Sequence, residues 1–523
     1  MKLPRRAFLR AGASTVALLA ATGCDQLPRE FRLLLALNRK EGGPFQPPVQ
    51  GAIDPITHVL NRAAFGGRPG DYEQILKMMA ASSRPKDSKS GDTKNAPDLR
   101  EVAQAYLERQ LNPEKIEDDD AEYAARRFET LGEPLGELFE YQPDLLQNEL
   151  MRATLTRAVL SERQLYEVMV QFWSDHFNID PSKGDCKWLK VSDDREVIRK
   201  HALGKFSDML RASALSPAML WYLDGRVNRR SNMSEKPNEN YARELLELHT
   251  LGVHGGYTQK DVMEVARCLT GWSVRSTVNK PYFQIGKVEF HPAQHDFGSK
   301  EILGERIRAL PSSAGKTERE ELGKHELERV LRIVTRHPST AQHIATKLCR
   351  HFIADEPPAG AVRAVADAFA QSEGDIRTTV RALFATEEFW QIRGTKFKRP
   401  FTFVTSALRA TGAKTDAGLE IVDYLMRMGH APFNYPTPDG YPDQASPWMG
   451  TLLWRWNFAV ALSQNRIKGT RVNFDKLHKN TGGDEGVMAH LLGRQPTAEE
   501  VQAYHDSGEG LALTLASPAF QRC

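Results

Sequence analysis

Residues 237–272 set polar side chains into two strongly helical segments joined by a glycine-rich turn, and this stretch constrains the fold more than any other. In the first segment Tyr241, Leu245 and Leu248 recur at i, i+4 and i+7, which places them on one helix face and predicts a buried stripe. Thr258 is a favourable N-cap for the second segment, whose apolar residues again repeat every 3.6 positions. The sequence therefore predicts a helical hairpin.

The opposite face of the first helix carries Asn240, Arg243, Glu244 and Glu247. Two carboxylates three residues apart beside a guanidinium have the chemistry to ligate a metal ion or to act as acid and base. The structural alternative is that Arg243 pairs with Glu247 at i+4 and ties neighbouring helices together. We favour the structural interpretation, and keep Glu244 as a catalytic candidate and the other three as binding candidates.

Most of the remaining sequence follows the helical period in segments separated by short polar turns, as in stacked antiparallel helix pairs. One long helix is predicted over 145–177 and another over 195–212. Alternating apolar residues over 282–291 give the strongest β signal and predict one or two short strands. We therefore expect a mainly α fold, with a single large multi-helix domain over 51–521 and a small β insertion near 282–304.

Two loops interrupt the helical pattern. Residues 82–97 are polar, charged and aperiodic, which predicts a mobile surface loop. Residues 432–447 are rich in Pro, Gly and Asp and precede an aromatic helix over 448–462. We expect this Pro-rich loop to pack over the core.

The first 24 residues predict export. Arg5 and Arg6 are followed by Phe-Leu-Arg and a short apolar run diluted by Gly, Ser and Ala, a pattern that resembles a twin-arginine signal. The alternative is an ordinary N-terminal helix that begins with two arginines. The run ends in Ala-Thr-Gly-Cys at Cys24, which resembles a bacterial lipobox, where the signal is cut before the cysteine and the thiol carries lipid. The other interpretation is a plain cut nearby that leaves Cys24 as an ordinary residue.

Residues 25–50 predict a spacer, and Asp25 directly after the cysteine resembles the inner-membrane retention signal of some bacterial lipoproteins. No other apolar run approaches the roughly 18 to 20 residues that a spanning helix needs. We therefore expect an exported protein, periplasmic or otherwise extracytoplasmic, that is lipid-anchored to the cytoplasmic membrane through Cys24.

Composition narrows the classes of function. Seventy Lys and Arg against 67 Asp and Glu give a net charge of +3, and no basic cluster is interleaved with aromatic residues, so nucleic-acid binding is set aside. Beyond Cys24 the four cysteines are widely spaced and form no CxxC, which excludes a disulfide framework but leaves one disulfide open. The sequence contains no HExxH, GxSxG or Walker motif, and no GxGxxG that opens a βαβ unit.

Histidines supply the other candidates. His176 and His201 lie in helical segments, whereas His295 and Asp296 lie in a loop, so convergence of these side chains would assemble a metal or catalytic site. A single histidine among aromatic residues is more often a satisfied core residue. His295 and Asp296 form the stronger pair, because the carboxylate is placed to orient the imidazole. Asp224 and His201 are kept as binding candidates, and a divalent metal as a candidate cofactor.

In their order along the chain these motifs resemble the bacterial family called domain of unknown function 1800, over about residues 53–521. The matching segments include FWSDHF at 172–177, HALGKF at 201–206, PAML at 217–220, PNENYAREL at 237–245, LTGW at 269–272, HD at 295–296 and LASPAF at 515–520. The departures are local, since His430 stands where such sequences more often have Gln and 439–442 lacks their usual Trp. The resemblance implies an exported, mostly helical protein, often encoded beside a second exported family that resembles sulfatases and alkaline phosphatases. It implies no established reaction, so no catalytic role is carried over.

Two functional hypotheses follow. The first is a cell-envelope enzyme, a metal-assisted hydrolase acting on an extracytoplasmic substrate, with Glu244, His176, His295 and Asp296 as catalytic candidates that should converge in one pocket. The second is a non-catalytic scaffold or assembly factor for an exported sulfatase- or phosphatase-like partner. The second hypothesis predicts dispersed histidines and a broad exposed surface that is apolar or bears tryptophan.

Overall fold

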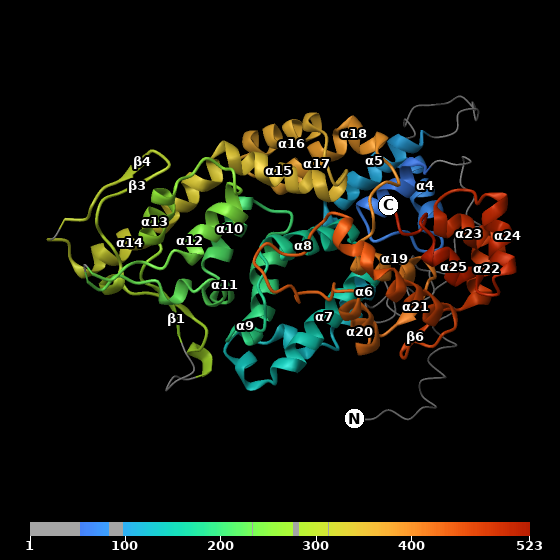
Figure 1. The fold of residues 1–523 in the computed structure, drawn as a ribbon, viewed down its shortest axis with the longest axis horizontal. Helices are drawn as coiled ribbons and strands as arrows, with labels where there is room; N and C mark the ends of the chain where they lie inside the picture. Colours follow the sequence, from blue (N-terminus) through green and yellow to red (C-terminus); the bar gives the residue numbers. More distant parts are fainter. Residues whose placement is uncertain (1–52, 83–97, 233, 276–281, 312) are drawn as a thin grey trace, which may run out of the picture.

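The computed structural model describes residues 53–82, 98–232, 234–275, 282–311 and 313–523. Over these ranges the chain is mainly α-helical, as predicted, and its strands form three two-stranded antiparallel sheets (Figure 1). The export signal and spacer predicted over 1–50 lie outside the described residues, as does the predicted mobile loop beyond Ser82. None of the described helices is both long and apolar enough to span a bilayer.

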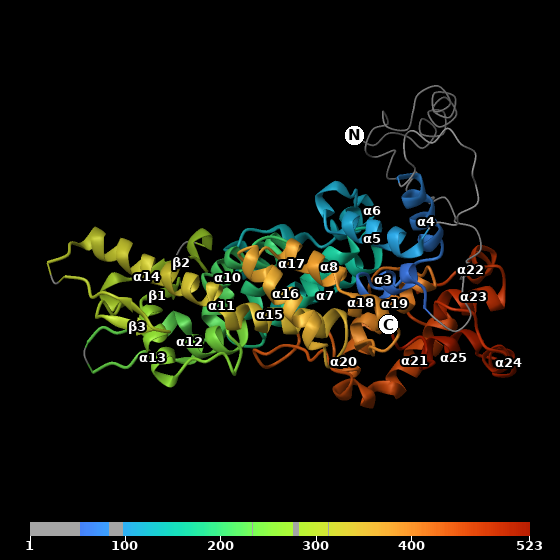
Figure 2. The same ribbon diagram turned by 90° about the horizontal axis from the view of Figure 1, so that it is seen from above.

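The chain runs along an elongated molecule and returns, so that N-terminal and C-terminal helices share one end and the predicted hairpin lies near the other (Figures 1 and 2). The helices of the outward path are α3 (Pro55–Arg62), α4 (Asp71–Ser82), α5 (Leu99–Gln110), α6 (Asp119–Ala125), α7 (Pro143–Leu160), α8 (Gln164–His176), α9 (Cys186–Asp193), α10 (Phe206–Ala214), α11 (Pro217–Tyr222), α12 (Asn240–Glu244) and α13 (Gln259–Cys268). Those of the return path are α14 (Lys316–Arg336), α15 (Pro338–Phe352), α16 (Ala359–Gln371), α17 (Ile376–Ala385), α18 (Glu387–Gln391), α19 (Pro400–Ala410), α20 (Leu419–Arg427), α21 (Leu452–Ser463), α22 (Phe474–Thr481), α23 (Asp484–Leu492), α24 (Ala498–Asp506) and α25 (Gly510–Ala516).

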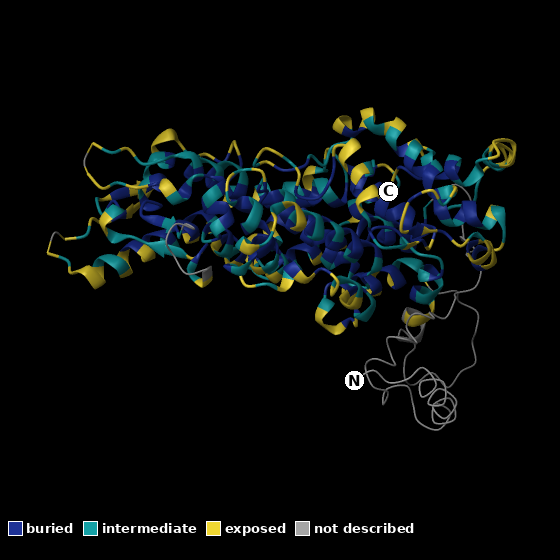
Figure 3. Ribbon diagram, turned by 90° about the horizontal axis from the view of Figure 1, so that it is seen from below, coloured by how far each residue is buried: buried dark blue, intermediate teal, exposed yellow. Residues whose placement is uncertain are grey.

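Shorter helical elements join these. Two are π-helices, η5 (Asp194–Arg199) and η7 (Leu245–Thr250). The 3-10 helices are η2 (Pro113–Lys115), η3 (Glu129–Gly132), η4 (Glu137–Glu140), η6 (Gly225–Val227), η8 (Tyr282–Gln284), η9 (Pro292–Gln294) and η10 (Ser446–Thr451). Buried apolar side chains form a continuous cluster that extends from Ile56 to Phe520, and Figure 3 shows buried residues along the whole length of the molecule.

The β insertion is present near the predicted residues, but its strands are shorter than expected. Strand β1 (Trp272–Val274) pairs with β2 (Val288–Phe290), and β3 (Lys300–Ile302) pairs with β4 (Glu305–Ile307). A third small sheet, β5 (Lys414–Thr415) with β6 (Thr470–Arg471), was not predicted. The first part of the predicted strand, Tyr282–Gln284, is a 3-10 turn, and Gly286 at φ +76° turns the chain before β2 begins.

The prediction of one helix over 145–177 is wrong, because α7 and α8 are separated by residues 161–163. A carboxylate that is distant in sequence stabilises this interruption between the two helices. Asp118 accepts a hydrogen bond from the Ser161 hydroxyl at 2.8 Å and another from the Glu162 amide at 2.6 Å. These bonds satisfy polar groups at the interruption, so a tertiary contact overrides the local helical preference.

The helix predicted over 195–212 is also divided. After η5 the chain bonds to the loop between α16 and α17 before α10 begins. The Phe206 amide donates to the Gly374 carbonyl at 2.8 Å, and the Ile376 amide donates to the Gly204 carbonyl at 2.9 Å. Periodicity reports only local preference, so it does not reveal a bridge of this kind.

The predicted hairpin consists of α12, η7 and α13, and Thr258 caps α13 in a reciprocal capping box with Asp261. The predicted buried stripe is correct for Tyr241 and Leu245 but not for Leu248, which is only half-buried. The reason is the π-helix, since its wider turn advances the inward face by one residue. His249 is therefore fully buried in place of Leu248.

The Pro-rich loop over 432–447 packs across the end of α8, as expected. Asn178 donates from its side-chain amide to the carbonyls of Tyr435 and Thr437 at 2.9 and 2.7 Å, and the Tyr222 hydroxyl donates to the Pro436 carbonyl at 2.9 Å. Gly440 lies so close that a Cβ atom there would sit 2.0 Å from the Asp175 carbonyl oxygen. The loop thus approaches α8 backbone to backbone.

Gly440→Ala should destabilise the protein far more than Gly429→Ala. Both glycines have nearly the same left-handed φ, +73° and +72°, but no atom of the described residues lies within 4 Å of a Cβ at Gly429. The control should cost about 1–2 kcal/mol for its backbone conformation, and Gly440→Ala at least about 2 kcal/mol more, because the loop must move. Denaturant unfolding measures both, and equal losses would show that the close approach is not required.

Candidate functional site

His176 lies at the end of α8, fully buried where α8, η7, α15 and the Pro-rich loop meet. Its Nε2 atom lies 3.1 Å from the His249 carbonyl oxygen, and its Nδ1 atom lies 3.0 Å from Lys347 Nζ. Nε2 must therefore carry the proton, and Nδ1 accepts from the lysine. Burial, and then the charge of Lys347, hold the pKa of His176 well below its usual value.

Two more imidazoles lie beside His176. The ring centres of His249 and His343 are each 6.2 Å from that of His176. His343 Nε2 lies 3.1 Å from the Leu248 carbonyl, whereas neither ring nitrogen of His249 has a hydrogen-bond partner among the described residues. Burial lowers the pKa of His249 to about 3 and that of His343 to about 4. These imidazoles are therefore neutral at physiological pH.

An ion network borders the imidazoles. Arg399 bonds to Asp175 at 2.6 Å and lies 3.7 Å from Asp443, which in turn lies 2.9 Å from His351 Nδ1. Burial raises the pKa of Asp175 to about 6 against the effect of Arg399. Burial also opposes ionisation of Asp443, but His351 and Arg399 hold its pKa well below the usual value. Most of the charged groups in this region therefore form ion pairs or hydrogen bonds with one another.

The polar face of the hairpin follows the structural interpretation for most of its residues. Arg243 pairs with Glu247 at 3.3 Å and with Glu239 at 3.2 Å. Asn240 donates to Asp224, and Asp224 also pairs with Lys183 at 3.0 Å. These contacts tie α12 to the segments before it.

Glu244 is the exception on this face. Its carboxylate makes no side-chain hydrogen bond within the described ranges, and burial followed by the neighbouring Glu247 raises its pKa. Asp439 of the Pro-rich loop interacts electrostatically with both Glu244 and Lys347. Glu244 and His176 therefore approach the same loop, whereas His201 interacts with Lys200 and Asp208 instead.

His295 and Asp296 do not form the expected pair. His295 Nδ1 lies 2.8 Å from the Thr270 carbonyl, and its Nε2 lies 3.2 Å from Glu326, a residue of α14. Asp296 is bound by Arg267 at 2.8 and 3.1 Å and also by Arg230. The contacts of His295 involve none of the residues that contact His176, so the predicted catalytic set does not converge.

Glu326, which was not predicted from the sequence, completes this second cluster. Lys300 is buried and donates to Glu326 at 2.6 Å. A signal was present, because Glu326 stands in the buried stripe of α14 beside Leu327 and Val330. A charged residue on an apolar helix face indicates a buried ion pair.

No group of three or more His, Cys, Asp or Glu side chains in the described part of the chain is arranged to hold a metal ion. The four described cysteines, Cys186, Cys268, Cys349 and Cys523, are buried and unpaired, so the disulfide left open by the sequence is not formed among them.

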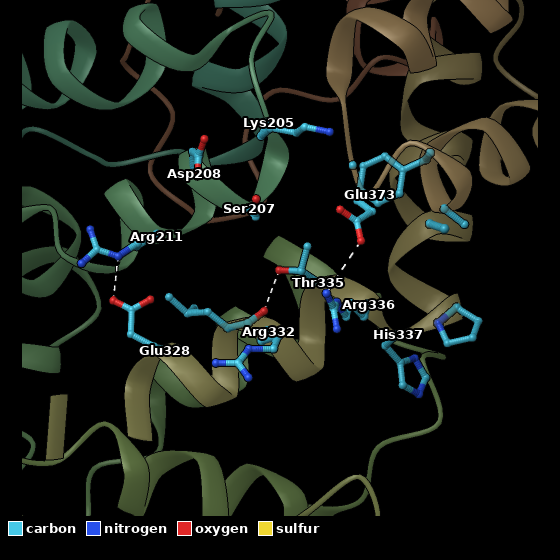
Figure 4. Close-up of a pocket in the computed structure, with 16 residues that line it drawn as sticks. Lys205, Ser207, Asp208, Arg211, Glu328, Arg332, Thr335, Arg336, His337 and Glu373 are labelled. Atoms are coloured by element: carbon cyan, nitrogen blue, oxygen red, sulfur yellow. Dashed lines mark hydrogen bonds and ion pairs between the residues drawn. The ribbon is translucent and has the colours of Figure 1, made fainter. Parts of the chain in front are cut away.

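A cleft that none of the candidate residues lines lies between α10, α14 and the loop that joins α16 to α17 (Figure 4). Its volume is about 640 Å³, within the range of ligand sites. Arg211 pairs with Glu328 at 2.6 Å at one end, and Arg336 lies 3.7 Å from Glu373 at the other. The cleft therefore has an ion pair at each end.

An apolar surface covers α20, η10 and α21. Met449, Leu452, Leu453 and Trp456 are exposed by 52, 45, 65 and 37%, and they recur at i, i+3, i+4 and i+7 on one helix face. Leu419 and Met426 of α20 are also exposed. The two helices contact each other, since Tyr424 packs on Phe458 and Arg427 lies over the Trp454 ring. We call the exposed side chains on these three elements the docking face.

Comparison with known proteins places most of the chain in one family. The family model described as "Protein of unknown function (DUF1800)" matches residues 58–522. No curated protein and no solved structure matches the chain.

His249→Phe should make the protein less sensitive to acid. The pKa of His249 falls from 6.5 in the unfolded chain to about 3 in the folded one, so its contribution to stability is present above pH 6.5 and is lost as the pH falls towards 3. Between about pH 7 and about pH 5 the unfolding free energy should therefore drop about 2 kcal/mol less in the variant than in the wild type. Denaturant unfolding at both pH values measures this, with His325→Phe, an exposed position on α14, as control. Parallel pH curves for wild type and His249→Phe would contradict the assignment.

Glu326→Gln should destabilise the protein by about 3–5 kcal/mol, because it leaves the buried Lys300 ammonium without its carboxylate. Adding Lys300→Met should recover part of that loss. The exposed pair Lys324 and Glu320, 2.7 Å apart on the same helix, provides the control, for which Glu320→Gln should cost no more than about 1 kcal/mol. A double-mutant cycle on thermal or denaturant unfolding gives the coupling, and additive losses would argue against a coupled pair.

Proposed function

This chain belongs to the DUF1800 family, and we propose that it is an exported scaffold or assembly factor that holds a protein partner on its docking face. The observation that carries the proposal is the row formed by Met449, Leu452, Leu453 and Trp456, which places four large apolar side chains in solvent. Contiguous exposed apolar surface of this kind marks interaction sites on soluble proteins.

The composition of the docking face favours a protein as its occupant. Trp and Met are enriched at protein interfaces, and apolar anchors at i, i+3, i+4 and i+7 fit a partner helix or groove. A charged pair lies on the neighbouring helix, where Arg427 and Asp423 form an exposed ion pair at 2.6 Å and Arg427 lies over the Trp454 ring. Polar groups at the edge of an apolar centre are typical of specific interfaces.

The partner we propose is the exported protein, similar to sulfatases and alkaline phosphatases, that the family resemblance implies. In this arrangement the partner performs the chemistry and the present chain holds it at the cell envelope. The polar clusters support a structural role for the scaffold itself, because most of their charged groups are bonded to one another.

A hydrolase is the second candidate, and one observation favours it. Glu244 is partly buried, its pKa is raised, and it has no side-chain hydrogen bond among the described residues, which suits a general acid. His176 lies near the same loop, but its unprotonated Nδ1 atom already accepts a hydrogen bond from Lys347. We rank this candidate below the scaffold because His295 and Asp296 belong to another cluster.

Leu453→Glu should abolish capture of the phosphatase-like partner, because it places a charge at the centre of the apolar row. A tagged full-length chain purified from its own cell envelope should retain the partner in the wild type and lose it in the variant, as identified by mass spectrometry. Val253→Glu provides the control, since Val253 is 60% exposed but lies at the bend of the hairpin. Glu244→Gln should also retain the partner.

Two outcomes would contradict the scaffold. One is retention of the partner by Leu453→Glu. The other is wild-type self-association, measured by analytical ultracentrifugation, that Leu453→Glu abolishes, because a second copy of the chain would then occupy the docking face. Loss of a hydrolytic phenotype in Glu244→Gln with partner capture intact would favour the second candidate.

A further inference from the structure

We propose that a pocket lined by residues from the start of the described chain, from 390–394 and from the C-terminal region binds the phosphate group of an anionic phospholipid. The pocket has a volume of about 590 Å³, and its walls include Ile53, Trp390, Arg393, Leu492, Arg494 and Arg522. None of the described residues that line it is acidic. We call it the arginine pocket.

Two of its three guanidinium groups bond to no carboxylate among the described residues. Arg393 donates to the carbonyls of Ile53, at 3.0 Å, and Trp390, and Arg522 donates to the Thr395 carbonyl at 3.2 Å. Arg494 is held by Glu500 through two bonds of 2.7 and 2.8 Å. Since the guanidinium fork matches phosphate oxygens, Arg393 and Arg522 are the groups available to an anion.

Charges of both signs act on Arg393. Burial lowers its pKa, Asp54 raises it, and Arg100 lowers it to a smaller extent. The Asp54 carboxylate caps α3 by accepting from Ile56 and Thr57 at 2.8 and 3.2 Å, and Arg100 pairs with Glu387 at 2.5 Å. An anion at Arg393 and Arg522 would therefore displace no ion pair among the described residues. The cleft of Figure 4 differs at two of its arginines, since Arg211 and Arg336 are already paired with Glu328 and Glu373.

The apolar walls indicate a ligand that is more than a free ion. Trp390, Leu492 and Ile53 stand beside the guanidinium groups. A phosphodiester headgroup attached to glycerol and acyl carbons has the same combination of charge and apolar surface.

The position of the pocket in the chain agrees with this ligand. Ile53 forms part of the wall and directly follows the segment that carries Cys24, the predicted site of lipid attachment. A tether that joins the domain at the pocket keeps membrane headgroups at a high local concentration there. The inference is independent of the docking face, which lies on α20, η10 and α21.

Vesicle binding tests the arginine pocket in the full-length chain carrying Cys24→Ser, which removes the lipid anchor from the measurement. The protein should co-sediment with vesicles of phosphatidylglycerol and phosphatidylcholine but not with phosphatidylcholine alone. Arg522→Glu should weaken this binding about 30-fold, because each arginine near an anionic surface contributes about fivefold and reversal of its charge counts about twice. Arg306→Glu makes the same change of charge at the distant β3–β4 hairpin and should leave binding within about twofold.

Three results would overturn the inference. If Arg522→Glu and Arg306→Glu lose vesicle binding equally, the effect depends only on the net charge of the protein and not on the pocket. Binding that Arg522→Glu does not weaken would exclude the pocket. Inorganic phosphate that stabilises the parent protein but not Arg522→Glu in thermal unfolding, and that releases the protein from vesicles, would assign the pocket to soluble phosphate. Because Arg522 is exposed, the thermal midpoint of Arg522→Glu without ligand should match that of its parent, and retention of the phosphatase-like partner by this variant separates the two proposals.

Discussion

Arg399 lies between two carboxylates, Asp175 at the end of α8 and Asp443 in the Pro-rich loop, and much of the centre of the molecule depends on this interaction. Asp443 also contacts His351 of α15, so one connected network fixes two helices, the start of α19 and the loop. Burying such charges costs solvation free energy that their attraction only partly returns. We interpret the network as a device for specificity, because it defines where the loop lies over His176 more than it adds to stability.

Local rules predicted most of the fold and less of the site. The helical period identified the mainly α architecture, and the capping residue Thr258 marked the start of α13, because both signals are written in neighbouring residues. The errors fall where distant residues decide the outcome. Asp118 interrupts the helix predicted over 145–177, and Glu326, rather than the adjacent Asp296, faces His295. Two residues that are adjacent in a loop need not contact each other, because their side chains point to different neighbours.

The two proposals assign different work to different surfaces of one elongated body. Inside, lysine, arginine, histidine and carboxylate groups are bonded mainly to one another, which suits a rigid support. Outside, the apolar row on η10 and α21 is exposed, and the arginine pocket presents two guanidinium groups that bond to no carboxylate among the described residues. A scaffold that meets a membrane at one surface and a protein at another requires this separation.

The π-helix η7 makes the hairpin depend on a single residue. In an uninterrupted α-helix the inward positions after Tyr241 would be Leu245 and Leu248, and the imidazole of His249 would lie about 80° round the helix from Tyr241, at the edge of the inward face. Deleting one residue between Leu245 and His249 would shift the helical register of every position after it. The amino-acid composition would hardly change, so it would not reveal that the buried histidines are misplaced. Length variation among related chains in these few positions would thus separate those that assemble the buried histidines from those that keep only the outline of the fold.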